Sequence, residues 1–243
     1  MKFSLLRPAL AIGAALTLAS CGGGGGKQTY PINVEVYNVQ YPGLVLSTNG
    51  QDLTINGTSD LNTPIKATFP QEIEYGVEYD VLPKGQTETN LAGGSLPQHQ
   101  SCSSGSSGFP RRNTAGLLQK IDVVVVCSVN AYPVGGTIKG LTGTGLVLIN
   151  GSSGSSYVAS PVIDATTKLP TDIKWALTQP GGLVAAPVTY NTTYGVTVLT
   201  QPSGQNCTVT GGNSPANNGS GTMDADAEKA GGVSNIVVTC TNK

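Results

Sequence analysis

Charged residues are scarce in this sequence. Asp, Glu, Lys and Arg make up 11% of the 243 residues, against roughly 25% in an average soluble domain. The 13 basic and 14 acidic residues nearly cancel, and Arg111-Arg112 is the only basic pair of adjacent residues. A protein that binds the phosphates of nucleic acid needs a cluster of basic charge. We therefore expect no nucleic-acid partner.

Histidine occurs once, as His99. A Ser–His–Asp or Cys–His arrangement must use this residue, but its surroundings, LPQHQSCSSGSSGF, are typical of a polar loop. A Gly-x-Ser-x-Gly nucleophile elbow on a strand–helix turn is also missing. We expect an exposed loop histidine, no catalytic residue and no cofactor.

Long apolar segments are missing from the N-terminal region as well. The apolar stretch of residues 8–18 is too short for a membrane helix, which needs about 20 residues. Lys2 and Arg7 precede it and small residues follow it. Residues 1–20 therefore have the organisation of a secretion signal.

The end of this leader, Leu18-Ala19-Ser20-Cys21, resembles the lipobox of bacterial lipoproteins. The resemblance implies cleavage before Cys21, a diacylglycerol on its thiol and an acyl chain such as palmitate on its amino group. Several acyl chains hold a protein durably on a membrane. Residues 21–31 would then form a lipidated, flexible Gly-rich tether, and Gly22 resembles the pattern sorted to the outer membrane. The alternative is an ordinary secreted protein in which Cys21 is incidental or pairs elsewhere.

Glycine and proline are abundant, with 33 and 15 residues, and they interrupt the chain every few residues. Asn-Gly pairs at Asn49, Asn56 and Asn150 are hairpin-type turn signals. Only residues 164–177 and 223–230 could hold a helical turn or two. We predict an all-β fold of antiparallel sandwiches. The predicted strands include residues 33–39, 44–46, 146–149, 196–199 and 236–238.

The sequence after the leader contains a duplicated unit. GLVL occurs at residues 43–46 and again at 145–148, each time followed shortly by Asn-Gly. Tyr75-Gly76-Val77 matches Tyr194-Gly195-Val196, and EYDVLPKGQ matches TVLTQPSGQ. We predict a first β-sandwich over residues 32–130 and a second over 134–243, joined by a short link with Pro133.

Five cysteines are present, and four remain if Cys21 carries lipid. An exported chain meets an oxidising compartment, and four cysteines allow three pairings. Only Cys102–Cys127 with Cys207–Cys240 treats both copies alike, so we predict these two disulfides. A zinc site would need close Cys-x-x-Cys or His spacing, which the chain lacks.

The second copy resembles a β-rich repeat of bacterial exported lipoproteins. The resemblance is carried by GLTGTGLVLINGSS, YGVTVLTQPSGQNCTVTGG and VSNIVVTCT, and it covers most of residues 134–243. It implies an immunoglobulin-like fold and brings no catalytic residues. The first copy shares GLVL and the final cysteine strand, but PKGQTETN lacks the GQ-x-C spacing and its cysteine follows an insertion.

Two groups of side chains are candidates for a site. Asp224, Asp226 and Glu228 alternate as in a calcium loop, but the EF-hand glycine and distant glutamate are missing, which favours a solvated acidic loop. An aromatic platform for sugar stacking is the second candidate, although a single Trp more often fills a core. Its members are Trp175, Tyr157, Tyr190 and Tyr194.

Together these patterns predict a lipoprotein of the bacterial outer membrane, facing the periplasm or the surface. Its partners would be membrane lipid, through Cys21, and a protein or glycan of the envelope. The expected role is a non-catalytic binding or structural module. The alternative is an envelope hydrolase with a loop-borne metal or carboxylate pair, such as Asp164 or Asp172 with Asp224 or Asp226.

Overall fold

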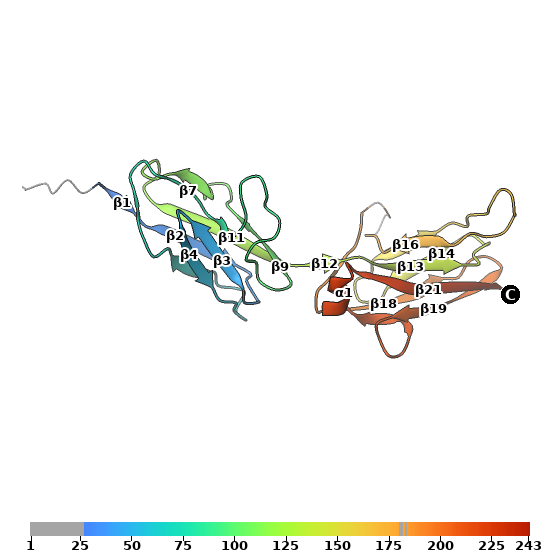
Figure 1. Cartoon of the computed structure of the whole chain (residues 1–243). Coiled ribbons are helices and arrows are strands. Elements are labelled where there is room, and N and C mark those ends of the chain that lie inside the picture. Colours follow the sequence, from blue (N-terminus) through green and yellow to red (C-terminus); the bar gives the residue numbers. More distant parts are fainter. Residues whose placement is uncertain (1–26, 180–181, 183) are drawn as a thin grey trace, which may run out of the picture.

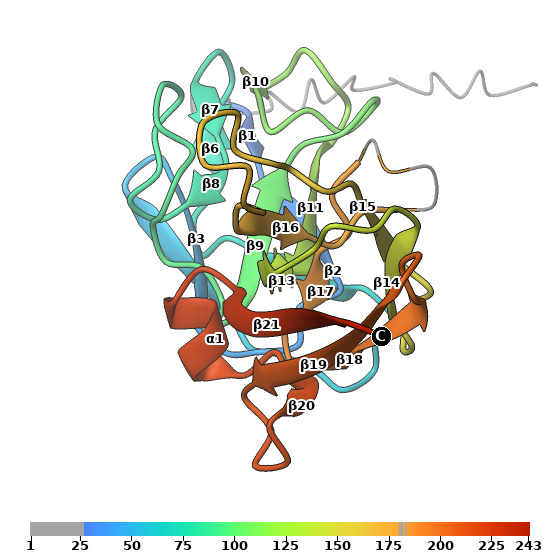
Figure 2. The same cartoon turned by 90° about the vertical axis from the view of Figure 1, so that its right-hand side faces the viewer.

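The chain folds into two halves that lie end to end (Figure 1), and the halves overlap when viewed along the long axis (Figure 2). This computed structural model describes residues 27–179, 182 and 184–243. Within them, 21 strands accompany one short helix, α1 (Ala225–Lys229). The predicted all-β class is confirmed, and the several sheets fit a β-sandwich. The predicted signal peptide, Cys21 and most of the Gly-rich tether lie outside the described residues.

The first half contains two main sheets and two ribbons. The main sheets have the orders β5-β2-β11-β9 and β4-β3-β8, and the ribbons are β1-β6 and β10-β7. The strands are β1 (Thr29–Tyr30), β2 (Ile32–Tyr37), β3 (Leu44–Thr48), β4 (Gln51–Ile55), β5 (Ile65–Thr68), β6 (Ile73–Glu74), β7 (Glu78–Asp80), β8 (Leu82–Pro83), β9 (Gln100–Ser104), β10 (Arg112–Thr114) and β11 (Ile121–Val129).

The second half contains one ribbon, β12-β17, and a single folded sheet of order β15-β14-β18-β20-β19-β21-β13-β16. β20 pairs with both β18 and β19 and so joins the two layers. The strands are β12 (Ala131–Tyr132), β13 (Val134–Lys139), β14 (Leu146–Asn150), β15 (Ser156–Ala159), β16 (Ile173–Ala176), β17 (Val188–Thr189), β18 (Thr193–Thr200), β19 (Gln205–Gly212), β20 (Asn218–Thr222) and β21 (Val233–Asn242).

Alternating apolar residues explain these strands and give each half its own core. In β2, every second side chain is buried, as expected for a strand with one face on a core. β3 and β14 bury their leucines in the same way. One buried cluster draws on residues from Ile32 to Cys127 and the other on residues from Val134 to Cys240.

The two halves share one pattern of strand pairing. β2 lies between β5 and β11, and β11 continues to β9; β13, β16, β21 and β19 repeat this arrangement. In the other layer, β3 pairs with β4 and β8 as β14 pairs with β15 and β18. Residues 31–48 therefore correspond to residues 133–150 at a constant offset of 102, as with Leu46 and Leu148.

The sheets are mixed, which corrects the expectation of purely antiparallel sandwiches. β2 runs parallel to β11, and β13 runs parallel to β21. In each half these are the early and the final long strand, so the intervening chain serves as the long crossover that parallel strands require. Alternation in the sequence identifies strands but carries no information on their direction.

Each half has a disulfide between directly opposed residues of neighbouring antiparallel strands. Cys102 on β9 faces Cys127 on β11, and Cys207 on β19 faces Cys240 on β21. Both pairs are bonded, each with Cα atoms 4.0 Å apart. The structure thus has the predicted pairing, and Cys102 occupies the place of Cys207.

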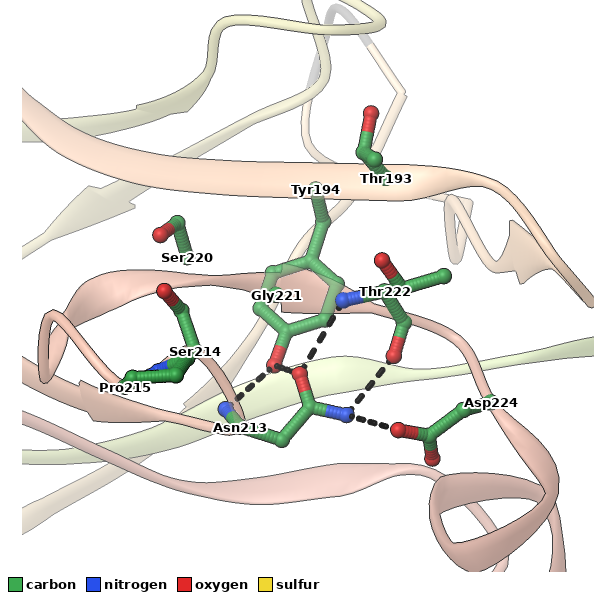
Figure 3. A pocket seen from close by; sticks show the side chains of 9 residues that line it. All are labelled: Thr193, Tyr194, Asn213, Ser214, Pro215, Ser220, Gly221, Thr222 and Asp224. Carbon is green, nitrogen blue, oxygen red and sulfur yellow. Dashed lines mark hydrogen bonds between the residues drawn. The ribbon is translucent and has the colours of Figure 1, made fainter.

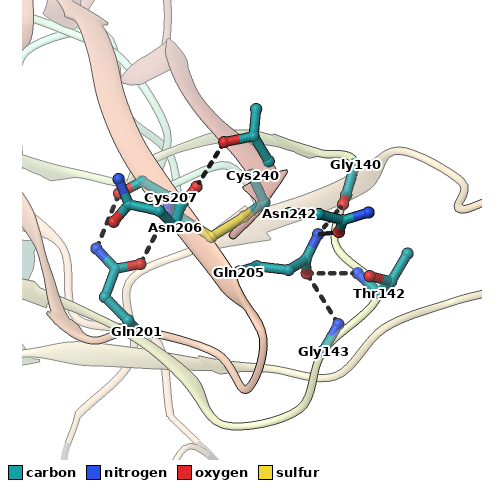
Figure 4. Close-up of a disulfide and its surroundings, with 10 residues drawn as sticks. Gly140, Thr142, Gly143, Gln201, Gln205, Asn206, Cys207, Cys240 and Asn242 are labelled. Atoms are coloured by element: carbon teal, nitrogen blue, oxygen red, sulfur yellow. Dashed lines mark hydrogen bonds between the residues drawn. A yellow bond between two sulfur atoms is a disulfide. The ribbon is translucent and has the colours of Figure 1, made fainter.

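A buried glutamine two residues before the first cysteine of each pair binds the turn that follows the first long strand. Gln205 Oε1 accepts hydrogen bonds from the Thr142 and Gly143 amides at 2.8 Å, and its Nε2 donates to Gly140 O at 2.8 Å (Figure 4). Gln100 makes the same three bonds in the first half, to residues 40, 41 and 38. Both glutamines are 2% exposed.

These bonds correct one detail of the predicted match between the copies and locate the predicted insertion. The first half does contain the Gln-x-Cys spacing, at residues 100–102, because PQHQSC at 97–102 corresponds to PSGQNC at 202–207. The ten residues 85–94 are inserted before it, since Lys84 and Ser95 are joined by a hydrogen bond.

Tyr75 corresponds to Tyr190 and not to Tyr194. The amides of Tyr75 and Tyr190 bind the carbonyls of Gln28 and Asn130, which are themselves equivalent. The counterpart of Tyr194 is Tyr79.

Candidate interaction site at the junction of the two halves

Three aromatic rings meet where the first half contacts the second. The imidazole of His99 lies flat on the ring of Tyr190, with centroids 3.7 Å apart and 7° between the planes. Tyr41 meets both rings edge-on, at 5.4 Å from His99 and 6.1 Å from Tyr190. Edge-to-face contact is one of the favourable geometries for such rings, and Tyr41 adopts it toward both partners. Because Tyr41 and His99 belong to the first half and Tyr190 to the second, the rings join the halves.

His99 stands where the second half has a glycine. Its backbone φ is +58°, and that of the equivalent Gly204 is +72°, in the left-handed region that favours glycine. The Asn130 amide donates a hydrogen bond to the His99 carbonyl at 2.8 Å. The side chain is 20% exposed, so the expectation of an exposed loop histidine is wrong.

Glu228 is the hydrogen-bond acceptor of the junction. Its carboxylate contacts His99 Nδ1 and accepts hydrogen bonds from Tyr132 OH at 2.7 Å and Asn130 Nδ2 at 3.3 Å. Burial alone raises the pKa of Glu228, but the hydrogen bonds from Tyr132, His99 and Asn130 outweigh it and hold the pKa below its ordinary value of 4.5. The group is therefore an anion at neutral pH, and hydrogen bonds to a charged acceptor are stronger than neutral ones.

Helix α1 places Glu228 at this point. Asp224 caps the helix, with Oδ1 accepting from the Ala227 amide at 2.9 Å, as short polar side chains do at helix starts. Ala227 is buried against the second core. After the helix, Gly232 has a φ of +126°, and a Cβ there would lie 2.4 Å from the Pro133 carbonyl. The chain therefore returns tightly against the link between the halves.

A polar hollow of about 370 Å³ lies beside this helix (Figure 3). Asn213 organises it: Oδ1 accepts from Tyr194 OH at 2.8 Å, and Nδ2 donates to Thr222 O at 2.7 Å and to Asp224 Oδ2 at 2.9 Å. Hydroxyl, amide and carboxylate groups line its wall, from Thr193, Tyr194, Asn213, Ser214, Ser220, Thr222 and Asp224. Such a wall suits a polar ligand.

The acidic candidates do not converge. Asp224 and Asp226 line a second hollow of about 390 Å³ on the other side of Asn213, whereas Glu228 is bound by His99, Tyr132 and Asn130 at the junction. Among the described residues, no three His, Cys, Asp or Glu side chains are grouped as metal ligands.

The aromatic candidates do not form one platform. Trp175 is 6% and Tyr194 2% exposed, both in the second core. Tyr157 is half-buried beside Trp175, with ring centroids 6.0 Å apart, and Tyr190 lies at the junction.

The suggested carboxylate pairs lie at opposite ends of the second half. Asp164 and Asp172 belong to the loop between β15 and β16, where Ile173 faces Ile138 near the far end of β13. Asp224 and Asp226 belong to the segment before β21, whose first residue Val233 faces Val134 at the junction end. Asp164 instead accepts hydrogen bonds within its own loop, from Thr166 and Thr167.

The sequence interpretation did not find Tyr41, Asn130 or Tyr132 as site residues. Tyr41 reaches the site only because the halves dock. Asn130 and Tyr132 come from the link and reach Glu228, 98 and 96 positions away, through the fold of the second half. The one available signal was the Pro-x-x-Gln-x-Cys pattern, which places His99 at a turn that is glycine in the other half.

Comparisons of the chain with protein-family models, with curated proteins and with solved structures give no match. Within the part of the chain that the structure describes, no helix has the length and apolar character needed to cross a membrane.

Proposed function

We propose that this chain is a lipid-anchored lipoprotein of the bacterial outer membrane, with two copies of one immunoglobulin-like unit after a Gly-rich tether. The two units serve as a non-catalytic binding or structural module in the envelope or at the surface. Membrane lipid is one partner, through Cys21, and an envelope protein or glycan is the other.

The use of cysteine carries the proposal. The four cysteines among the described residues form two disulfides, one inside each half. The chain has five cysteines, so the fold leaves Cys21 without a cysteine partner of the same chain. Its position directly after Leu18-Ala19-Ser20 is the one a lipobox requires. This supports lipidation over the alternative in which Cys21 pairs within the chain.

The junction supports a structural or binding role. The contact of Glu228 with His99 and the stacked rings of His99 and Tyr190 hold the halves end to end, which suits a module that holds a site away from its anchor. The polar hollow around Asn213 is the candidate site for a glycan or a peptide, because its wall offers both hydrogen-bond donors and acceptors.

Metabolic labelling with a radioactive fatty acid tests the anchor. We expect label on the full chain in the membrane fraction, and loss of both label and membrane association in Cys21→Ala. The double variant Cys102→Ala with Cys127→Ala is the matched control and should keep the label. Label retained in Cys21→Ala would refute the anchor.

Protease treatment of intact and lysed cells then tests the side of the membrane. Cleavage on intact cells would support capture of an external ligand. Protection until lysis would support an envelope partner in the periplasm.

A further inference from the structure

We propose that the end of the first half farthest from the junction rests on the surface of a lipid bilayer. The contact is a patch of Tyr30, Tyr75, Leu117 and Leu118, called here the proximal patch. The inference rests on the proposed lipid anchor at Cys21 and adds to it a second, non-covalent contact with the membrane.

The proximal patch is apolar and open. Tyr75 is 62%, Leu117 68% and Leu118 41% exposed. A Cβ on Gly116 would lie 2.3 Å from the Tyr75 ring and 3.3 Å from Tyr30 OH, so both tyrosines pack around this glycine. Tyr30, Leu117 and Leu118 also line one hollow of about 540 Å³. These residue types are suited to a membrane interface. Leucine side chains are apolar, and a tyrosine combines an apolar ring with a hydroxyl group that remains hydrated.

The same place in the second half is a contact surface. Tyr30 and Tyr75 correspond to Tyr132 and Tyr190, because β1 pairs with β6 as β12 pairs with β17. Tyr190 is half-buried and stacks on His99 of the first half. Tyr132 is half-buried beside it and donates a hydrogen bond to Glu228, whose carboxylate contacts His99. The surface that the second half uses for docking is therefore uncovered in the first half. Residues 117–120 take the place of helix α1 on this surface.

The far end of a second copy does not complete this surface head to tail. In the second half, the equivalent surface contacts the end of the first half that carries His99 and Tyr41. At the far end of the second half, the equivalent residues are Gly204 and Gly143, which offer no ring to stack on a tyrosine. Head-to-tail association through this contact is therefore not supported by the residues available.

The length of the tether brings the proximal patch to the membrane. Seven residues, 22–28, separate Cys21 from β1, which begins at Thr29, and they span at most about 25 Å when fully extended. β11 runs from this end toward the junction, so the proximal patch lies on the same end as β1. With Cys21 in the bilayer, this end of the first half is the one held nearest to the lipid headgroups.

The charges around the proximal patch balance. Lys27 and Lys120 are exposed, but Lys27 Nζ pairs with Glu74 Oε2 at 2.6 Å, and Glu72 accepts a hydrogen bond from Thr29. The contact is therefore apolar, and we expect it to be as strong on zwitterionic as on anionic lipid.

The test uses the full lipidated protein in phosphatidylcholine vesicles with brominated acyl chains, which quench tryptophan on contact. We expect the added tryptophan of Leu117→Trp to be quenched and shifted to the blue, equally so when phosphatidylglycerol replaces phosphatidylcholine. Leu169→Trp is the matched control because Leu169 is 64% exposed in the loop at the opposite end. Trp175 contributes the same background to both variants.

The proposal is overturned if Leu117→Trp, like Leu169→Trp, emits as strongly in brominated vesicles as in ordinary vesicles. So does a covalent cross-link between two chains that is lost in Leu118→Asp, because a second copy would then cover the patch. Acyl label on Cys21 is measured in the same preparation. Label without quenching refutes the patch alone, whereas a missing label refutes the anchor and with it the placement of the patch.

Discussion

At the scale of single residues, the two buried glutamines show how one side chain fixes a turn. Gln100 and Gln205 each satisfy two backbone amides and one carbonyl that no strand partner reaches. A buried polar group left without its partner costs about 1–3 kcal/mol. The carboxamide is suited to the task because it donates and accepts at once.

Replacing Gln205 with leucine should therefore lower the free energy of unfolding of the second half by about 2–4 kcal/mol. Trp175 lies in the second core, so its fluorescence during urea unfolding reports on that half. Gln179→Leu, at an exposed position of the same half, should change stability by less than about 0.5 kcal/mol. Equal effects of the two substitutions would contradict the role assigned to the buried amide.

A glycine in β13 shows why equivalent positions need different residues. Val34 in β2 corresponds to Gly136 in β13, where a Cβ would lie 1.7 Å from the Ile236 carbonyl. The pairing of β13 with β21 is irregular between Val134 and Gly136, whereas β2 pairs regularly with β11. A β-bulge brings the backbones together and excludes a side chain.

At the scale of the elements, the sequence predicts strands and cysteine pairs well. GLVL in both halves becomes β3 and β14, and Asn49-Gly50 forms a two-residue hairpin turn with φ of +48° and +73°, as this dipeptide favours. Residues 223–230 contain α1, but residues 164–177 form turns and β16 instead of a helix. Helical spacing is weak evidence in a short segment, where pairing with a neighbouring strand decides the structure.

Correspondence between the halves was harder to predict, for a local reason. Both halves contain two tyrosines four residues apart, Tyr75 and Tyr79 or Tyr190 and Tyr194, so a match displaced by four residues still aligns a tyrosine. The inserted residues 85–94 also include a Gly-Gln pair that imitates Gly204-Gln205. Only the hydrogen bonds of the fold distinguish these alternatives.

The disulfides should stabilise each half separately. Cys207 and Cys240 are 33 residues apart, and closing a loop of this size contributes about 3–4 kcal/mol on the chain-entropy model. Changing both to alanine should lower the urea midpoint seen by Trp175 fluorescence. The same change at Cys102 and Cys127 should leave that midpoint in place and weaken only the transition of the first half, followed by circular dichroism. If the change at Cys102 and Cys127 shifted the Trp175 midpoint, the two halves would unfold as one unit.

At the scale of the whole molecule, the contact between the halves depends on a carboxylate. The sequence did not predict this contact, because His99 and Glu228 are 129 positions apart and neither lies in a pattern that indicates the other. Docking of two folded surfaces creates the site. Because each half has its own core, the hydrogen bonds of the junction can be changed without unfolding either half.

The junction should loosen in acid. The folded pKa of Glu228 lies below its ordinary value of 4.5, so its stabilisation is present above about pH 4.5 and is lost as the pH falls through the lowered pKa. Small-angle X-ray scattering should show a broader range of distances between the halves at pH 3 than at pH 7.

Glu228→Gln should already show the broad distribution at pH 7. The matched control is Glu78→Gln, because the Glu78 side chain is 71% exposed. A narrow distribution for Glu228→Gln at pH 7 would show that the rings alone hold the junction.

The parallel pairing of the early and final strands in each half has a mechanical consequence. β2 and β11 run side by side in the same direction, so the chain enters at one end of the half and leaves at the other. A force that pulls these ends apart acts along the strands and loads all of their hydrogen bonds together, in shear. β13 and β21 have the same arrangement. A chain tethered at one end and gripped at the other would therefore resist tension along its length, since neither parallel pair can be peeled apart one bond at a time.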